Sequence, residues 1–232
     1  MLYIYKMNKI CLVVLCLLMT TKVLPQSSSL IPQEPQEPSG AVTIASSSLE
    51  LADGNLYFAE AEKNERRGDL NDAITLYGKA AFEYNSSKLF SRYAEALLRL
   101  SNVHYQLSHY GEAEQVVLNV ALKTYSRLGS KAGQMDSYSQ LGKIYLASNK
   151  LTQSLWFYTQ QGILAKQVNN NTEYIESVLG IANVKIKKKE YVMALRDLNR
   201  AELLARSSNN SSFKMRIRDA RALIPSKIAN KT

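Results

Sequence analysis

The sequence predicts an all-α fold, an α-solenoid built from four helix–turn–helix hairpins and a C-terminal capping helix. Proline is absent from Ser39 to Ile224, and an interior proline would remove a helical hydrogen-bond donor and clash with the preceding turn. One residue pattern recurs four times at intervals of 40 or 41 residues. Within the copies, apolar residues follow the i, i+3, i+4 and i+7 spacing of helices. Such hairpins bury their apolar faces only by stacking on one another, which is the principle of a solenoid.

The N-terminal segment, residues 1–26, has the composition of a signal peptide. Its apolar run from Ile10 to Met19 follows a basic start and is shorter than the ~20 residues that a membrane-spanning helix needs. We therefore expect an exported protein, periplasmic or secreted. An uncleaved anchor that keeps the chain near a membrane is one alternative, and a lipid-modified cysteine is another. Both cysteines, Cys11 and Cys16, lie in this segment, so the mature chain would hold no disulfide and no thiolate metal site.

Two further segments differ from the repeats in composition. Residues 27–48 are rich in Pro, Gln, Glu and Ser, which bury too little apolar surface to offset chain entropy, and they predict a disordered linker. Residues 226–232 form a short basic tail. The solenoid is expected over residues 49–225, with nine helices and no sheet.

The four copies align without gaps when they start at Glu60, Leu100, Leu141 and Ile181. Two columns, twelve positions apart, hold only small residues, and small side chains let neighbouring helix axes approach closely. The first column is Ala61, Ser101, Gly142 and Ala182, and the second is Ala73, Ala113, Ser154 and Ala194. A turn falls between the columns, at Gly68-Asp69, Ser108-His109, Asn149-Lys150 and Lys189-Glu190, and separates the two helices of each copy.

An amphipathic segment follows the fourth copy. It places Phe213, Ile217, Ala220 and Ile224 on one side, and Pro225 ends it. A single helix with a charged outer face is what the end of a solenoid requires, so the pattern predicts a cap. A basic helix that binds a membrane surface or a partner is the alternative.

The third copy resembles the tetratricopeptide repeat, in which a Leu-Gly-x-x-Tyr run precedes a small residue and then an aromatic residue. The matching residues are Leu141, Gly142, Tyr145, Ser154 and Tyr158. The second and fourth copies keep most of these positions, but the period exceeds the usual ~34 residues and the closing proline is absent. The resemblance implies a tetratricopeptide-like solenoid with long helices, and HEAT-type stacking, with a period of ~40–47 residues, is the alternative.

The resemblance also implies a binding face. In tetratricopeptide arrays the first helix of each hairpin lines the concave side, which binds peptides or proteins. The corresponding positions here are Asn102, Tyr105, Lys143, Leu146, Asn183 and Ile186. An asparagine amide can bond a ligand backbone through both a donor and an acceptor. Members that bind chaperone tails carry lysine where this chain has Leu98, Ser139 and Leu179, so recognition of a C-terminal carboxylate is not expected.

The sequence contains little that could support catalysis. It has two histidines, His104 and His109, and neither a glycine-rich phosphate loop nor a nucleophile elbow. The formal net charge of +9 arises mainly at the two ends of the chain, so no basic stripe for nucleic acid follows the repeats. We expect no enzyme activity, no cofactor, no metal, no small-molecule substrate and no nucleic-acid partner.

These observations together predict an exported interaction scaffold that binds a peptide or protein partner on its concave face. The alternative is a sensory input module of a bacterial signalling system, whose output domain is absent from the chain or encoded separately.

Overall fold

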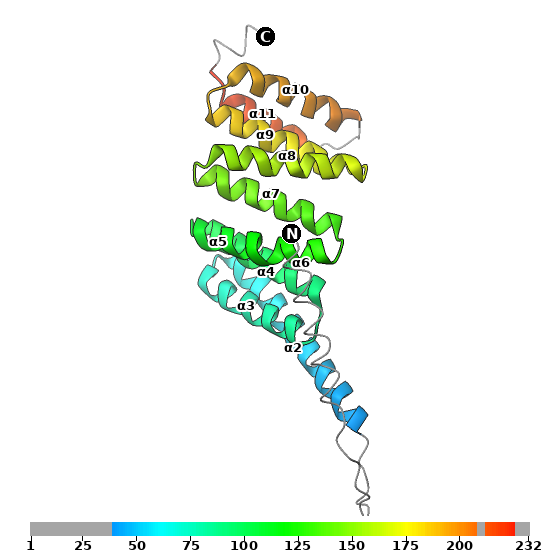
Figure 1. Cartoon of the computed structure of the whole chain (residues 1–232). Helices are drawn as coiled ribbons and strands as arrows, with labels where there is room; N and C mark the ends of the chain where they lie inside the picture. Colours follow the sequence, from blue (N-terminus) through cyan, green and yellow to red (C-terminus); the bar gives the residue numbers. More distant parts are fainter. Residues whose placement is uncertain (1–38, 208–211, 226–232) are drawn as a thin grey trace, which may run out of the picture. The chain divides into compact units, whose positions relative to one another are not determined.

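The computed structural model describes residues 39–207 and 212–225, and every regular element among them is a helix (Figure 1). The described residues from Gly40 onward belong to one compact unit. The helices are α2 (Ser39–Arg67), α3 (Leu70–Ser86), α4 (Phe90–Gln106), α5 (Tyr110–Val116), η1 (Val117–Ala121), α6 (Leu122–Arg127), α7 (Lys131–Ala147), α8 (Leu151–Gln167), α9 (Asn171–Lys187), α10 (Tyr191–Ser207) and α11 (Ser212–Ala222). Because α5, η1 and α6 follow one another without a break, this part of the chain forms nine helical rods, as predicted.

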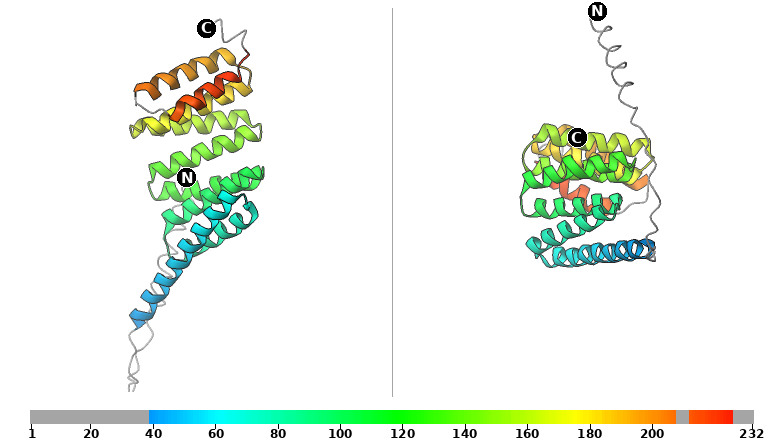
Figure 2. Two further views of the ribbon diagram at one scale, coloured as in Figure 1. Left: turned by 180° about the vertical axis from the view of Figure 1, so that it is seen from behind. Right: turned by 60° about the horizontal axis from the view of Figure 1, so that its bottom comes forward.

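The rods stack in the order in which they occur along the chain (Figure 2). α3 packs on α4, α7 on α8, α8 on α9, and α9 on α10. The first helices of successive hairpins also touch one another, since α4 contacts α7, α7 contacts α9, and α9 contacts α11. The predicted α-solenoid is confirmed, and its first helices form one continuous surface, called here the first-helix face.

The turns between the rods share one geometry. In each of the seven turns within residues 39–207, the first or second residue after the helix has a positive φ; these residues are Gly68, Lys88, Ser108, Gly129, Asn149, Asn169 and Lys189. In the third hairpin the amide of Lys150 donates to the carbonyl of Tyr145 (2.8 Å), and the amide of Asn149 donates to that of Leu146 (3.3 Å). This pair of bonds is the Schellman motif that ends helices. The turns predicted within the copies are confirmed, and the same kind of turn also joins one copy to the next. The two helices of the third hairpin, α7 and α8, both have 17 residues.

All eight residues of the two small columns are buried, which confirms that they are close-packing positions. In the second hairpin the Ser101 hydroxyl donates to the carbonyl of Ala113 (2.9 Å). In the third, the Ser154 hydroxyl donates to the carbonyl of Gly142 (2.7 Å). The columns therefore face each other across each of these hairpins. Each buried serine hydroxyl in the columns thus has a backbone carbonyl of the facing helix as its hydrogen-bond acceptor.

The rod formed by α5, η1 and α6 contains an inserted residue. Its beginning aligns with α3 at an offset of 40, Ala113 with Ala73, but its end aligns at 41, Tyr125 with Tyr84. Both tyrosine carbonyls accept the closing bond of a Schellman motif, so the two ends are equivalent. The extra residue is absorbed by the π-helical turn η1, whose hydrogen bonds span five residues instead of four. This turn accounts for the 41-residue interval between the second and third copies.

The first described helix begins inside the segment predicted as a linker. α2 starts at Ser39, so residues 39–48 are helical. The proline-spaced composition ends at Pro38, and no residue between it and residue 49 prevents helix formation. The predicted signal peptide, the rest of the linker and the basic tail lie outside the described residues.

The C-terminal helix behaves as a cap. Phe213, Ile217, Ala220 and Ile224 are buried in one apolar cluster with residues of α9 and α10, as the amphipathic pattern predicts. Across the described helices, none combines the length and the hydropathy needed to cross a bilayer.

Candidate functional site

Two adjoining cavities open on the first-helix face. The Tyr158 cavity has a volume of about 350 Å³, and the Asp136 cavity has a volume of about 450 Å³. Ser139, Lys143, Glu176 and Arg216 line both of them. All lining residues come from α4, α7, α9 and α11 except Tyr158, which reaches the surface from α8. Four successive layers of the solenoid thus contribute to one continuous recess.

The structure brings five of the six predicted binding residues to this recess. Tyr105, Lys143, Leu146 and Asn183 line the Tyr158 cavity, and Asn102 lines the Asp136 cavity. The sixth, Ile186, is instead half-buried against the apolar cluster of α9, α10 and α11. The predicted binding positions are therefore not equivalent in every layer, because Ile186 packs against the apolar surface of the last hairpin and its cap.

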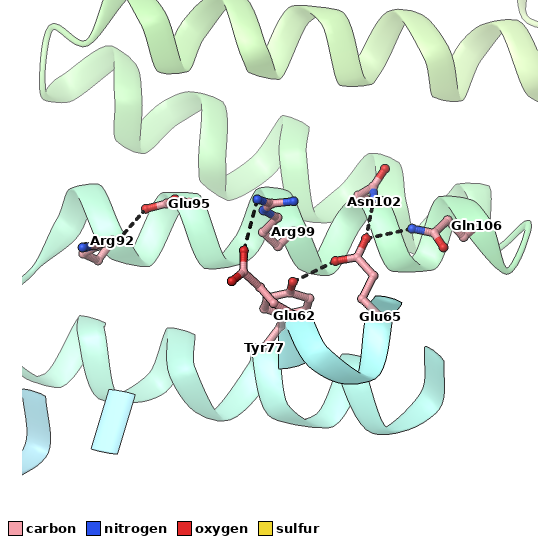
Figure 3. A network of polar contacts seen from close by, with 8 residues as sticks. All are labelled: Glu62, Glu65, Tyr77, Arg92, Glu95, Arg99, Asn102 and Gln106. Carbon is pink, nitrogen blue, oxygen red and sulfur yellow. Dashed lines mark hydrogen bonds and ion pairs between the residues drawn. The ribbon is translucent and has the colours of Figure 1, made fainter. Parts of the chain in front are cut away.

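Asn102 is already engaged within the protein. Its amide nitrogen donates to a carboxylate oxygen of Glu65 (2.8 Å), and Gln106 donates to the same oxygen (2.8 Å). The buried Tyr77 donates its hydroxyl to the other oxygen of Glu65 (2.8 Å), so one carboxylate of α2 collects three donors (Figure 3). Burial, and secondarily this hydrogen bond, raises the pKa of Tyr77. The amide nitrogen of Asn102 thus joins two layers of the solenoid, a role that the sequence did not indicate.

Tyr158 lies between two glycines of neighbouring first helices. A Cβ atom placed on Gly142 would lie 2.7 Å from the tyrosine ring, and one placed on Gly180 would lie 2.4 Å from it. The side chain is buried, and this burial raises the pKa of its hydroxyl. Because neither glycine has a side chain, the Tyr158 ring can extend from α8 to the recess.

The part of the recess near the C-terminal ends of α7 and α9 is basic. The Lys187 ammonium donates to the carbonyl of Leu146 (2.8 Å) and links α9 to α7. Arg216 of the cap forms a two-point ion pair with Glu176, with one contact at 2.7 Å. The exposed Lys143 has no acidic side chain within ion-pair distance in the part of the chain that the structure describes.

The Asp136 cavity carries charges of both signs, because Arg99, Lys143 and Arg216 line it together with three acidic residues. Asp136 and Glu173 both line it, and the amide of Gln161 donates to Glu173 (2.8 Å). Reduced hydration, and next the negative charge of Glu173, raise the pKa of Asp136, while the charge of Lys143 opposes this. Gln140 also lines this cavity. Its side chain is buried, with 7% exposed, and its amide nitrogen has no hydrogen-bond partner among the described residues.

One acidic residue recurs at an equivalent position in three successive first helices, outside the two small columns. Glu95, Asp136 and Glu176 are 41 and 40 residues apart and place one carboxylate on each of three successive first helices. The unpaired state of Gln140, by contrast, depends on which side chains surround it and has no counterpart in the pattern.

The described residues contain no group of three or more His, Cys, Asp or Glu side chains that could hold a metal ion. The recess consists instead of hydrogen-bonding groups, charges of both signs and a few apolar side chains. Such a surface can bind a ligand through hydrogen bonds, ion pairs and apolar contacts.

No protein-family model matches the chain, and no curated protein matches it. Conclusions about function therefore depend on the geometry of the first-helix face.

Proposed function

We propose that the protein is an exported, non-enzymatic scaffold of the tetratricopeptide type that binds a peptide or protein partner along its first-helix face. The observation that carries this proposal is the recess formed by α4, α7, α9 and α11, in which two cavities adjoin across four layers.

The dimensions of the recess favour an extended polypeptide. Each cavity falls within the range of ~300–1,000 Å³ that is typical of ligand sites. Two such cavities side by side suit a chain that places successive side chains in successive hollows. The lining offers donors at Lys143 and Asn183, and acceptors at Asp136 and Asn183, so both polar groups of a peptide backbone can be satisfied.

The repeat geometry supports assignment to the tetratricopeptide type. The small columns face each other within the hairpins, and the buried Tyr158 packs on the glycine of the Leu-Gly pair. Two 17-residue helices joined by tight turns account for a period near 40, so the departure from ~34 residues is a matter of helix length. Export is proposed on the composition of residues 1–26 alone.

Photo-crosslinking would test the binding face. A benzoylphenylalanine at position 143 should form a covalent adduct with a partner in cells of the source organism, because Lys143 is exposed between the two cavities. The matched control is the same residue at position 112, where Glu112 is exposed on a second helix. Equal adduct formation at the two positions, or none at position 143, would contradict the proposal.

A further inference from the structure

The Asp136 cavity indicates which kind of polypeptide the recess suits. We propose that the partner segment is cationic, with a lysine or arginine side chain docked between Asp136 and Glu173 and a neighbouring backbone carbonyl bonded to the Gln140 amide. This inference rests on the proposed function and adds the chemistry of the ligand to it.

The first support is a pair of carboxylates without a cation. Within residues 39–207 and 212–225, neither Asp136 nor Glu173 has a basic side chain within ion-pair distance. Two neighbouring carboxylates on first helices are paired, Glu95 with Arg92 (3.3 Å) and Glu176 with Arg216. Asp136 is exposed and Glu173 is half-buried, so a cation between them would meet two carboxylates that have no ion-pair partner among the described residues, although Arg99, Lys143 and Arg216 line the same cavity.

The second support is independent of charge. The Gln140 amide has two N–H donors, and its nitrogen is buried at the wall of the same cavity without an acceptor in the described structure. A buried donor without a partner costs about 1–3 kcal/mol, so a ligand that brings a carbonyl oxygen removes this cost when the Gln140 amide turns its nitrogen into the cavity on binding. A peptide supplies such a carbonyl at every residue, whereas a free metal ion or a simple amine supplies none.

The two features lie close together along one helix. Asp136 and Gln140 are four residues apart on α7, so they occupy one side of the helix about one turn from each other. A lysine side chain and the carbonyl of a nearby residue in an extended peptide can therefore reach both. Lys143, one further turn along, lines the same cavity and would repel a second cation.

The net charge of the protein makes the inference testable. Because the whole chain carries a formal charge of +9, non-specific attraction favours acidic peptides. The probes are two fluorescein-labelled octapeptides, one of alternating lysine and alanine and one of alternating glutamate and alanine. Their binding to the protein is followed by fluorescence anisotropy.

The lysine peptide should bind more tightly than the glutamate peptide. The double variant Asp136→Asn, Glu173→Gln should weaken it about tenfold, because it removes both charges that the docked cation would meet. The variant Gln140→Met, which keeps the length of the side chain and removes both donors, should weaken it about fivefold. The control Asp72→Asn, Glu112→Gln removes the same charge from exposed sites on second helices and should change binding less than about twofold.

Three results would overturn the inference. Equal weakening by the control variant would show that only long-range charge matters. Tighter binding of the glutamate peptide, lost in Lys143→Ala, would refute a cationic ligand and support the proposed function. Binding of neither peptide, with a specific adduct still formed at position 143, would also refute the cationic ligand alone, whereas failure of both experiments would refute the proposed function as well.

Discussion

Replacing Gly180 by alanine should lower the stability of the protein or leave it unchanged, although the same change usually stabilises a helix. Gly180 lies inside α9, where alanine has a more favourable helix propensity than glycine by about 1 kcal/mol. The new Cβ atom would lie 2.4 Å from the ring of Tyr158, however, which is far inside van der Waals contact. The ring cannot move away freely, because Gly142 contacts it from α7 and the side chain is only 5% exposed.

The magnitude follows from two opposing contributions. Overpacking of a filled core typically costs about 1–3 kcal/mol, which equals or exceeds the gain in helix propensity. The matched control is Gly78→Ala in α3, where the described residues place no atom beyond the helix's own backbone within 4 Å of the added Cβ and only the propensity gain remains. The two variants should therefore differ in the free energy of unfolding by about 1–3 kcal/mol. For a domain of this size that is a difference of about 2–12 °C in Tm.

Thermal unfolding followed by the far-ultraviolet circular dichroism of the helices is the suitable assay. Tryptophan fluorescence is less informative, since Trp156 is 53% exposed in the native state. Gly78→Ala should raise Tm, and Gly180→Ala should lower it or leave it unchanged. In a Tyr158→Leu background the penalty at Gly180 should largely disappear, because the double variant removes the clash. If both alanine variants raise Tm equally, Tyr158 does not lie against α9 and the geometry of the recess is wrong.

Three further predictions concern the turns, the π-helical turn and the Glu65 network. Lys189→Gly should raise the stability by about 0.5–1 kcal/mol in urea unfolding, because Lys189 has a φ of 63° that glycine adopts without strain. Deletion of Asn119 should lower Tm less than deletion of Thr159, because η1 already contains the extra residue whereas α8 would lose its register; nuclear magnetic resonance shifts should then show a regular α-helix at residues 117–120. Glu65→Ala should cost about 1–3 kcal/mol, since the buried Tyr77 hydroxyl loses its acceptor, and an unchanged denaturation midpoint would contradict the network.

The sequence by itself determined the class of fold, the number of helices and the positions of the turns within the copies. These features depend on local properties that a periodic pattern records: helical spacing of apolar residues, absence of proline, and small residues where two helices touch. The columns that contain Ser101 and Ser154 could be predicted as contacts because the same arrangement is repeated in each hairpin.

Only the tertiary structure decided how the first-helix face is used. Residues about 40 positions apart become neighbours there, and the environment of each depends on what the adjoining layers supply. Asn102 meets Glu65 of the preceding layer, and Ile186 meets the apolar surface of the last hairpin and its cap. The Gln140 amide nitrogen meets no acceptor among the described residues. A repeat alignment treats such positions as equivalent. Their hydrogen bonds and burial are set across layers, where small differences in neighbouring side chains decide whether a polar group is already paired or remains open to a ligand.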